Sequence, residues 1–276
     1  MGFKRFEKNS FYSAFQSRKL FVRCLDLGNL RGYDVHWGVL QYWDFVEVNL
    51  DSLNTVNSEE ELLNIYRPPT DVVINKEVSE FDSGCQDFIA ASTFLLMGTV
   101  CLEGNLDVSP RGGPAGFVRI LDEKHIAIPD LNGNNRLDSI RNIINQGKIG
   151  LLFLIPGLGE TLRVNGSASI TTDKEILEIF PSELKTPKTA IVVQIEIGFI
   201  HCAKSFMRGG MWEPETWKDK ECRPSAGQIL VDHSGLEDEL TGGELEAMLE
   251  AGYKHDLKLD LSKKNRVAKN LRKLKR

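Results

Sequence analysis

The sequence has no long apolar run and few cysteines, and both features narrow the class of protein. No stretch is long and apolar enough to span a bilayer, and the first residues lack the apolar core of a signal peptide. The five cysteines are widely spaced, so they form neither a Cys-x-x-Cys metal pair nor a dense disulfide framework. We therefore expect a soluble, cytoplasmic protein with free thiols, no bound metal and no membrane partner.

Several familiar catalytic motifs are also missing. The sequence contains no Gly-x-Ser-x-Gly elbow, no His-Glu-x-x-His and no Walker A lysine pattern. Gly157-Leu158-Gly159 is too short for a dinucleotide-binding turn, and no β-α-β pattern surrounds it. These absences leave the catalytic residues, if there are any, unassigned.

The charge is slightly negative and unevenly distributed. A net charge of -5 argues against general affinity for nucleic acid. The segment from Lys254 to Arg276 is nevertheless strongly basic. We interpret it as a solvated or frayed helix, with a targeting or polyanion-binding role as the alternative.

The hydrophobic pattern divides the chain into three parts. Residues 1–57 sustain neither a helical nor a strand period and are predicted to be an N-terminal extension. Residues 58–232 are predicted to form one domain, which begins with a capping box of Ser58 and Glu61. Residues 233–276 are predicted to form a helical and basic tail, with an amphipathic helix over 237–251.

Short strands and tight turns dominate the predicted domain. Helices are expected over 80–91, from near 135, and from a cap at Thr172 to Phe180. A run of antiparallel strands with few short helices favours a closed barrel over a doubly wound parallel sheet. The strands are expected over residues 93–101, 106–109, 116–121, 125–129, 149–155, 162–170 and 189–200.

Polar clusters at 107–119, 128–139 and 160–166 are predicted to join one element to the next. Each carries an arginine beside small or amide-bearing residues, and such groups bind phosphate. The second cluster also opens a predicted helix, whose N-terminus favours an anion. Any one cluster could be an ordinary surface loop, but their occurrence together in one β domain favours a phosphate-bearing ligand.

The stretch from Phe88 to Trp217 resembles the pyridoxamine 5'-phosphate oxidase-like superfamily of FMN-binding split β-barrels, in particular a subfamily of FMN-dependent enzymes of unassigned substrate. The resemblance implies a mainly β (α+β) fold, an antiparallel split β-barrel with short flanking helices. The matching motifs are Phe88-Ile-Ala-Ala-Ser92, Asp107-Val-Ser-Pro-Arg-Gly112, Gly116-Phe-Val-Arg-Ile-Leu121, Gly133-Asn-Asn-Arg-Leu-Asp-Ser139, Gly150-Leu-Leu-Phe-Leu-Ile-Pro156, Glu160-Thr-Leu-Arg-Val-Asn-Gly166 and Phe199-Ile-His-Cys-Ala-Lys204.

The same resemblance implies phosphate and ring contacts. Arg119 falls where the family places a basic residue on the FMN phosphate, and Ile128 and Pro129 fall where backbone groups border the isoalloxazine ring. Asn135 and Arg136 fall where an Arg-Lys pair usually grips the phosphate. Asn135 is therefore a departure that removes one charge.

Further positions are implied around the flavin. Arg111 is a candidate to replace the charge missing at Asn135, and Ser109 and Arg163 are candidate supporting contacts. Thr161 falls where a glutamine commonly faces the flavin. Trp212 lies in a segment, with His201, Lys204 and Arg208, that could close the site from the same chain or from a partner chain; ordinary packing is the alternative for Trp212.

The resemblance also implies an activity. We expect an FMN-dependent oxidoreductase that acts on an unknown small molecule, with a nicotinamide as a possible electron donor, in a homodimer that holds the flavin between its subunits. No Arg-Leu-His-type motif follows Trp217, so a typical pyridoxamine-phosphate oxidase is not expected. The alternatives are a non-catalytic flavin-binding protein for sensing or storage, and a split barrel that binds haem or a deazaflavin. The basic residues Arg111, Arg119 and Arg136 favour a phosphorylated flavin over haem.

Overall fold

The computed structural model describes residues 49–261, which fall into two compact units. Within the described residues, one unit comprises 49–67 and 218–224, and the other comprises 68–217 and 225–261. The first unit contains η1 (Leu50–Ser52), α1 (Glu59–Ile65) and η3 (Lys220–Cys222). Helix α1 begins at the predicted cap, because the Ser58 hydroxyl accepts the N–H of Glu61 at 3.2 Å. The division at residues 57 and 232 stays a prediction.

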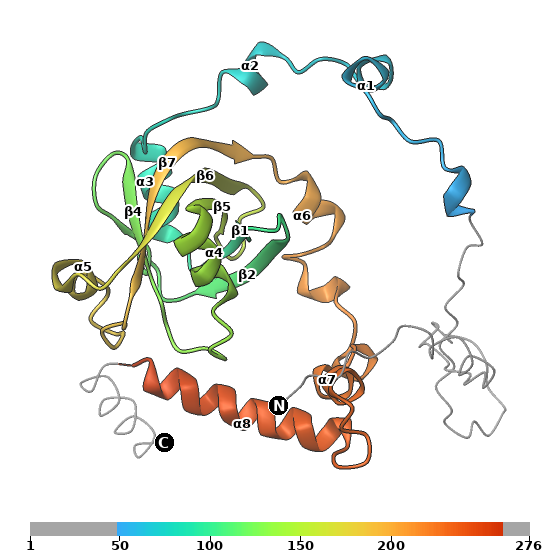
Figure 1. Cartoon of the computed structure of the whole chain (residues 1–276), viewed down its shortest axis with the longest axis vertical. Helices are drawn as coiled ribbons and strands as arrows, with labels where there is room; N and C mark the ends of the chain where they lie inside the picture. The colour runs from blue at the N-terminus through green and yellow to red at the C-terminus, as the bar shows by residue number, and fades with distance from the viewer. Residues whose placement is uncertain (1–48, 262–276) are drawn as a thin grey trace. The chain divides into compact units, whose positions relative to one another are not determined.

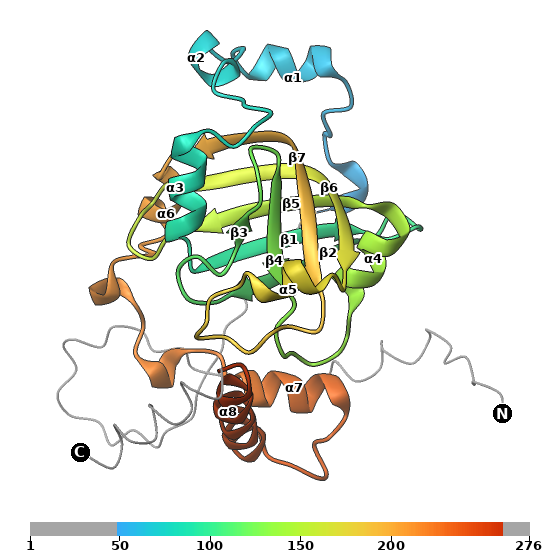
Figure 2. The same cartoon turned by 90° about the vertical axis from the view of Figure 1, so that its left-hand side faces the viewer.

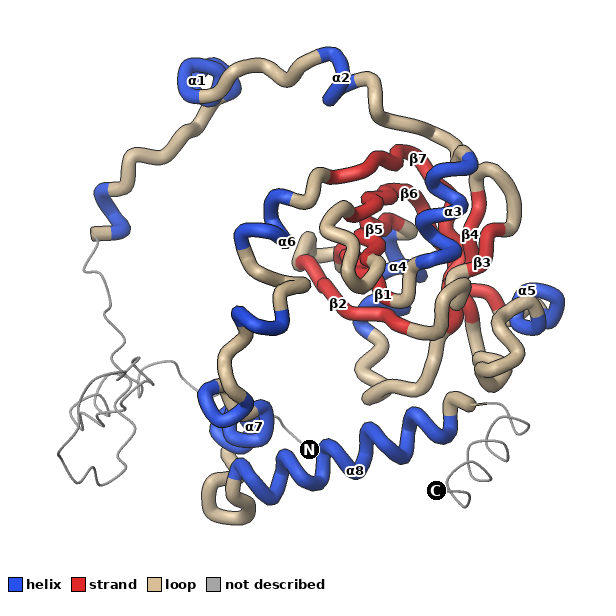
Figure 3. The backbone as a smooth tube through the Cα atoms, turned by 180° about the vertical axis from the view of Figure 1, so that it is seen from behind, coloured by secondary structure: helices blue, strands red, loops and turns tan. Residues whose placement is uncertain are grey.

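A seven-stranded antiparallel sheet forms the body of the second unit (Figures 1 and 2). The strand order is β2-β1-β5-β6-β7-β4-β3, and Figure 3 shows the strands curling into an open barrel. This is the expected mainly β, antiparallel split barrel. The strands are β1 (Phe94–Val100), β2 (Leu106–Gly112), β3 (Arg119–Ile120), β4 (His125–Pro129), β5 (Lys148–Leu154), β6 (Thr161–Thr171) and β7 (Ala190–His201).

Helices flank the sheet, and those over residues 83–91, 138–146, 174–178 and 242–259 overlap the expected ones. Helix α5 is capped by Asp173, whose carboxylate accepts the N–H of Glu175, and not by Thr172 as predicted. The helices of this unit are α2 (Asp71–Ile74), α3 (Ser83–Ala91), α4 (Asp138–Gln146), α5 (Lys174–Glu178), α6 (Lys204–Arg208), η2 (Pro214–Thr216), α7 (Ala226–Ser234) and α8 (Gly242–Leu259).

The start of α4 differs from the expectation. Asn135 and Leu137 both have positive φ angles, 58° and 61°, which helical residues do not adopt. The helix therefore begins at Asp138, after an irregular loop, and not near Asn135. The predicted C-terminal helix begins later, because Thr241 caps it in a capping box with Glu244, and it ends later, at Leu259.

The two faces of the sheet around β1 differ sharply. Leu95, Met97 and Thr99 point to one face and are buried, whereas Phe94 on the other face is partly exposed. The buried face packs in one core with Phe81, Phe117, Phe153 and the other large apolar side chains of the domain. Each such side chain contributes roughly 1.5–3 kcal/mol by leaving water. The opposite face lacks this cover, since Leu106 and Val108 of β2 are 81% and 67% exposed.

Two further observations concern the cysteines and the hydrophobicity of the helices. Cys85, Cys101 and Cys202 are free thiols. No helix between residues 49 and 261 combines the length and the hydrophobicity that crossing a membrane requires. The basic segment beyond residue 261 lies outside the described residues.

Candidate functional site

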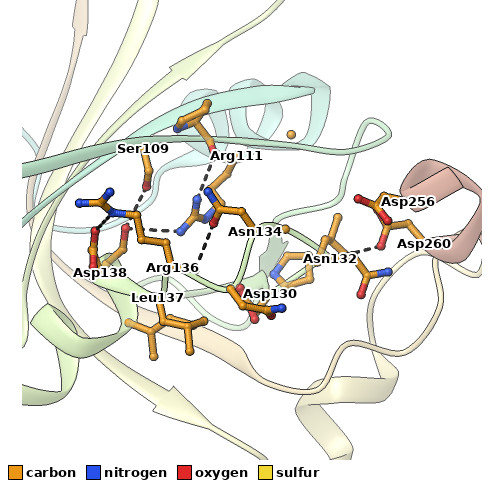
Figure 4. Close-up of a pocket in the computed structure, with 18 of the residues that line it drawn as sticks. Ser109, Arg111, Asp130, Asn132, Asn134, Arg136, Leu137, Asp138, Asp256 and Asp260 are labelled. Atoms are coloured by element: carbon orange, nitrogen blue, oxygen red, sulfur yellow. Dashed lines mark hydrogen bonds and ion pairs between the residues drawn. The ribbon is translucent and has the colours of Figure 1, made fainter. Parts of the chain in front are cut away.

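A cleft of about 770 Å³ lies between the end of β2, the loop that leads into α4, and α8 (Figure 4). We call it the first cleft. Every residue of the loop 130–137 lines it, and α8 contributes Tyr253, Asp256, Leu257 and the capping residue Asp260. Figure 4 shows Ser109, Arg111 and Arg136 gathered in one part of the cleft and Asp256 and Asp260 in another.

A hydrogen-bonded chain of side chains forms one wall of this cleft. Residues of odd number in β2 share a face with α4, which places Asp107 and Ser109 beside Ser139. The Ser139 hydroxyl donates to Asp107 at 2.6 Å, and the Ser109 hydroxyl is 2.9 Å from that of Ser139. Asn142 of α4 extends the chain by donating to Thr99 at 3.0 Å. These contacts fix the start of α4 against the sheet.

Arg111 is the cation held most firmly in the cleft. Its Nη1 donates to the carbonyl of Pro110 at 3.0 Å, and its Nη2 lies 3.4 Å from the Ser139 hydroxyl. The Nε atom is buried and has no hydrogen-bond partner among the residues that the structure describes. A buried donor without a partner costs roughly 1–3 kcal/mol, so an anion that accepts this N–H would be favoured.

Arg136 is placed differently. Its side chain is 78% exposed, and its Nε forms an ion pair with the carboxylate of Asp138. The hydrogen bond to Asp138, and then its charge, raise the pKa of Arg136 above the ordinary value. The positive φ of Asn135 directs the Arg136 backbone, whose N–H donates to the Asn134 side chain at 3.1 Å. Arg136 is thus available to a ligand only in competition with Asp138.

Carboxylates outnumber guanidiniums in the first cleft. Burial raises the pKa of Asp130 above its usual range, although Arg111 and Lys188 nearby act in the opposite direction. The Asp260 carboxylate accepts the N–H of Asn132 at 3.2 Å. Against Arg111 and Arg136, the lining therefore contains the carboxylates of Asp107, Asp130, Asp138, Asp256 and Asp260.

A second cleft of about 330 Å³ lies where β6 begins and β7 ends. Thr161 and His201 are paired across these two strands and both line it. Burial and the charges of Lys76 and Arg163 lower the pKa of His201. The other lining residues are Leu152, Cys202, Lys204, Ser205, Phe206 and Arg208.

The structure brings only part of the sequence-predicted site together. Ser109, Arg111, Pro129, Asn135 and Arg136 line the first cleft. Thr161 lines the second cleft and is buried.

The remaining predicted residues line neither cleft. Arg119 is exposed on β3, and Ile128 is fully buried in β4. Arg163 donates from Nε to the Asn165 side chain at 3.3 Å. Trp212 stacks on Phe206 with ring centroids 5.7 Å apart and donates to the carbonyl of Leu158 at 2.8 Å.

Sequence reasoning missed the acidic residues of the first cleft. Asp107, Asp130 and Asp138 stood inside the polar clusters that were singled out, so their place in the cleft could have been anticipated. Asp256 and Asp260 had no such signal, because they lie more than a hundred residues along the chain from the loop they approach. The cluster at 160–166 was also misplaced, since Thr161–Gly166 lie inside β6 and not in a joint between elements.

The fold and the clefts define a split-barrel protein with an open antiparallel sheet. Residues 81–202 match the family model described as Pyridoxamine 5'-phosphate oxidase. The resemblance to the pyridoxamine 5'-phosphate oxidase-like family that was seen in the sequence is therefore confirmed over this part of the chain. The match spans the whole seven-stranded sheet. No curated protein matches the chain.

Solved structures with a similar fold come from several bacteria. HupZ of Group A Streptococcus is 20% identical, with 43% of this chain and 92% of that chain covered and a TM-score of 0.37. A Clostridium acetobutylicum protein related to general stress protein 26 of B. subtilis, of the pyridoxinephosphate oxidase family, is 16% identical, with coverages of 43% and 85% and a TM-score of 0.33. The heme storage protein HutZ of Vibrio cholerae is 10% identical, with coverages of 44% and 93% and a TM-score of 0.32. Matches at this level say nothing about the ligand or activity of this chain.

Proposed function

We propose that this protein is an FMN-dependent oxidoreductase that acts on a small molecule. The observation that carries the proposal is the buried Nε of Arg111, which lacks a partner among the described residues and lies in a cleft lined by hydroxyls. A phosphate accepts hydrogen bonds from a guanidinium fork and from hydroxyls, so the residues present fit the phosphate of FMN.

Arg111, Ser109 and the backbone of residues 132–136 would hold that phosphate. Arg136 would turn from Asp138 to the ligand, since its exposed side chain meets little steric hindrance. FMN, when bound, supplies hydride transfer, and the protein's task is to bind and orient it. No side chain needs to act as a nucleophile, and we assign no catalytic residue.

A homodimer is part of the proposal. Thr161, expected near the flavin ring, and Arg111, assigned to its phosphate, line different clefts of one chain. The sheet face that carries Leu106, Val108 and Phe94 is apolar and exposed, as a surface that pairs with a second copy would be. We place the flavin between two such subunits, in the cytoplasm, with a nicotinamide as the electron donor.

A non-catalytic flavin-binding role is the second candidate. It is favoured by the carboxylates of α8, which line the first cleft and would restrict access of an anionic substrate or donor. A nicotinamide-dependent bleaching assay separates the two roles, since only the oxidoreductase would lose its flavin absorbance when the reduced nicotinamide is added. Haem or deazaflavin binding is a further alternative, which the visible spectrum distinguishes.

The deciding experiment is the visible spectrum of the purified protein with mass identification of any released chromophore, followed by titration of the apoprotein with FMN. Arg111→Met and Arg136→Ala should each weaken binding roughly 10- to 100-fold, because a charge-assisted hydrogen bond contributes about 1.5–3 kcal/mol. Arg141→Ala is the matched control, since Arg141 is exposed on α4 and does not line the cleft. A Soret band, or affinities unchanged in both variants, would overturn the proposal.

A further inference from the structure

Four cations surround the second cleft, and within residues 49–261 none of them is paired with a carboxylate. Lys204 and Arg208 line the cleft directly. Lys76 and Arg163 stand behind it, with Lys76 Nζ 4.7 Å and Arg163 Cζ 5.1 Å from the ring centroid of Phe199. None of these side chains forms an ion pair within the described part of the chain, and no lining residue carries a carboxylate.

The sheet fixes the positions of two of these cations, Lys76 and Arg163. Lys76 donates from Nζ to the carbonyl of Ile200 at 2.8 Å, which holds it beside the end of β7. Arg163 is paired with Phe199 across β6 and β7, and the Phe199 ring lies 4.9 Å from that of His201. Burial lowers the pKa of His201, and the charges of Lys76 and Arg163 lower it further. The field at this cleft is therefore positive, in contrast to the acidic first cleft.

The lining also offers groups that suit an organic anion. The hydroxyls of Thr161 and Ser205 are potential hydrogen-bond donors, and neither side chain has a hydrogen bond within residues 49–261. Phe206 and Leu152 provide apolar surface, and Trp212 backs the Phe206 ring at an interplanar angle of 21°. Hydroxyl donors, unpaired cations and an aromatic wall together fit a charged group attached to an apolar body.

We propose that the second cleft binds the phosphate or carboxylate group of a small organic molecule, with Lys204 and Arg208 as its charged contacts. The site is separate from the first cleft and does not require flavin there. Within an oxidoreductase, it would hold the anionic end of the second ligand, the substrate or the electron donor. The inference stands on the charges and the cavity alone, so failure of the flavin proposal would leave it untouched.

Cys202 provides a reporter for this site, because it is an exposed free thiol in the lining. Its rate of alkylation is measured by peptide mass spectrometry with iodoacetate, which is an anion, and with iodoacetamide, which is neutral. A positive cleft should raise the ratio of the two rates at Cys202 roughly threefold or more over that at Cys101. Cys101 is a suitable reference, since it lies in the β1–β2 turn beside the carboxylate of Glu103.

Site-directed variants test whether Lys204 and Arg208 cause this effect. The double variant Lys204→Gln/Arg208→Gln should lower the rate ratio at Cys202 towards that at Cys101, with Lys76 and Arg163 retaining part of the effect. Lys148→Gln is the control, because Lys148 is an exposed lysine paired with Glu196 at 3.0 Å and lines neither cleft. Arg136→Ala, which alters the first cleft, should leave the ratio unchanged. Thermal melts of each variant confirm that it is folded.

Protection by added anions identifies the charged group. If pyrophosphate slows the alkylation of Cys202 in the wild type but not in the double variant, the ligand carries a phosphate group. Benzoate that behaves in this way indicates a carboxylate ligand. Equal rate ratios at Cys202 and Cys101, or protection that survives in the double variant, would overturn the proposal.

Discussion

The carboxylate of Asp260 accepts a hydrogen bond from the backbone N–H of Asn132, with 3.2 Å between Oδ1 and N. The carbonyl of Asp260 also accepts the N–H of Lys185 at 2.6 Å, so the end of α8 is tied to two separate loops. The Asp260 carboxylate accepts a hydrogen bond from a backbone N–H of the loop, and the phosphate of a ligand would accept the same type of hydrogen bond there. Asp260 is therefore placed to compete with an anion in the first cleft.

Asp260→Asn should strengthen FMN binding. The amide keeps an acceptor oxygen for Asn132 but loses the negative charge, and we expect affinity to rise about two- to tenfold, in line with the small energies of partly exposed charges. Fluorescence titration with FMN measures the change. Glu250→Gln is the control, because Glu250 lies on α8, pairs with Lys254 at 3.3 Å and does not line the cleft. Equal gains in both variants would show a general charge effect and contradict a specific role for Asp260.

The contact between Asp260 and Asn132 also marks the limit of what the sequence could predict. Strand β1 was predictable because its apolar run over Phe94–Val100 is followed by the turn residues Glu103, Gly104 and Asn105, and both signals are local. The loop before α4 was not, because the left-handed conformation of Leu137 depends on the surrounding structure, and leucine, unlike glycine or asparagine, does not favour that conformation. The acidic side of the first cleft depends on contacts between distant segments, which no local pattern encodes.

Ionisation of Asp130 should make the folded protein less stable as the pH rises, which is the opposite of the usual effect of a carboxylate. Burial is the main cause that raises its folded-state pKa above the ordinary value of 3.8, so the neutral form is favoured in the folded protein. Its contribution to stability is therefore fully present below pH 3.8 and is lost as the pH rises through the raised pKa.

Asp130→Asn, which cannot ionise, isolates this contribution. At a pH above the raised pKa of Asp130, the variant should be more stable than the wild type. The difference in stability should shrink as the pH falls towards 3.8, the ordinary pKa of the side chain. Urea unfolding midpoints at neutral pH and below pH 4 provide the comparison. If the stability advantage of the variant over the wild type grows on acidification instead, the charges of Arg111 and Lys188 outweigh burial in setting the pKa of Asp130.

Gly166 occupies a position where the sheet leaves no room for a side chain. The pairing of β6 with β7 shifts between Asn165 and Gly166, and a Cβ atom at Gly166 would lie 1.9 Å from the carbonyl oxygen of Gln194. An alanine there must push two central strands apart. The sequence analysis attached this residue to a phosphate-binding cluster, whereas its surroundings give it a structural role.

Gly166→Ala should therefore destabilise the domain by about 1–3 kcal/mol or more, the range expected for overpacking. Thermal unfolding followed by circular dichroism measures the loss. Gly98→Ala is the matched control in β1, because its Cβ would meet the nearest atom, the carbonyl oxygen of Gly150, at an ordinary 3.7 Å. FMN affinity of the folded Gly166→Ala protein should stay close to that of the wild type, since Gly166 lines neither cleft. A stable variant with weakened FMN binding would restore Gly166 to the ligand site and contradict the structural role.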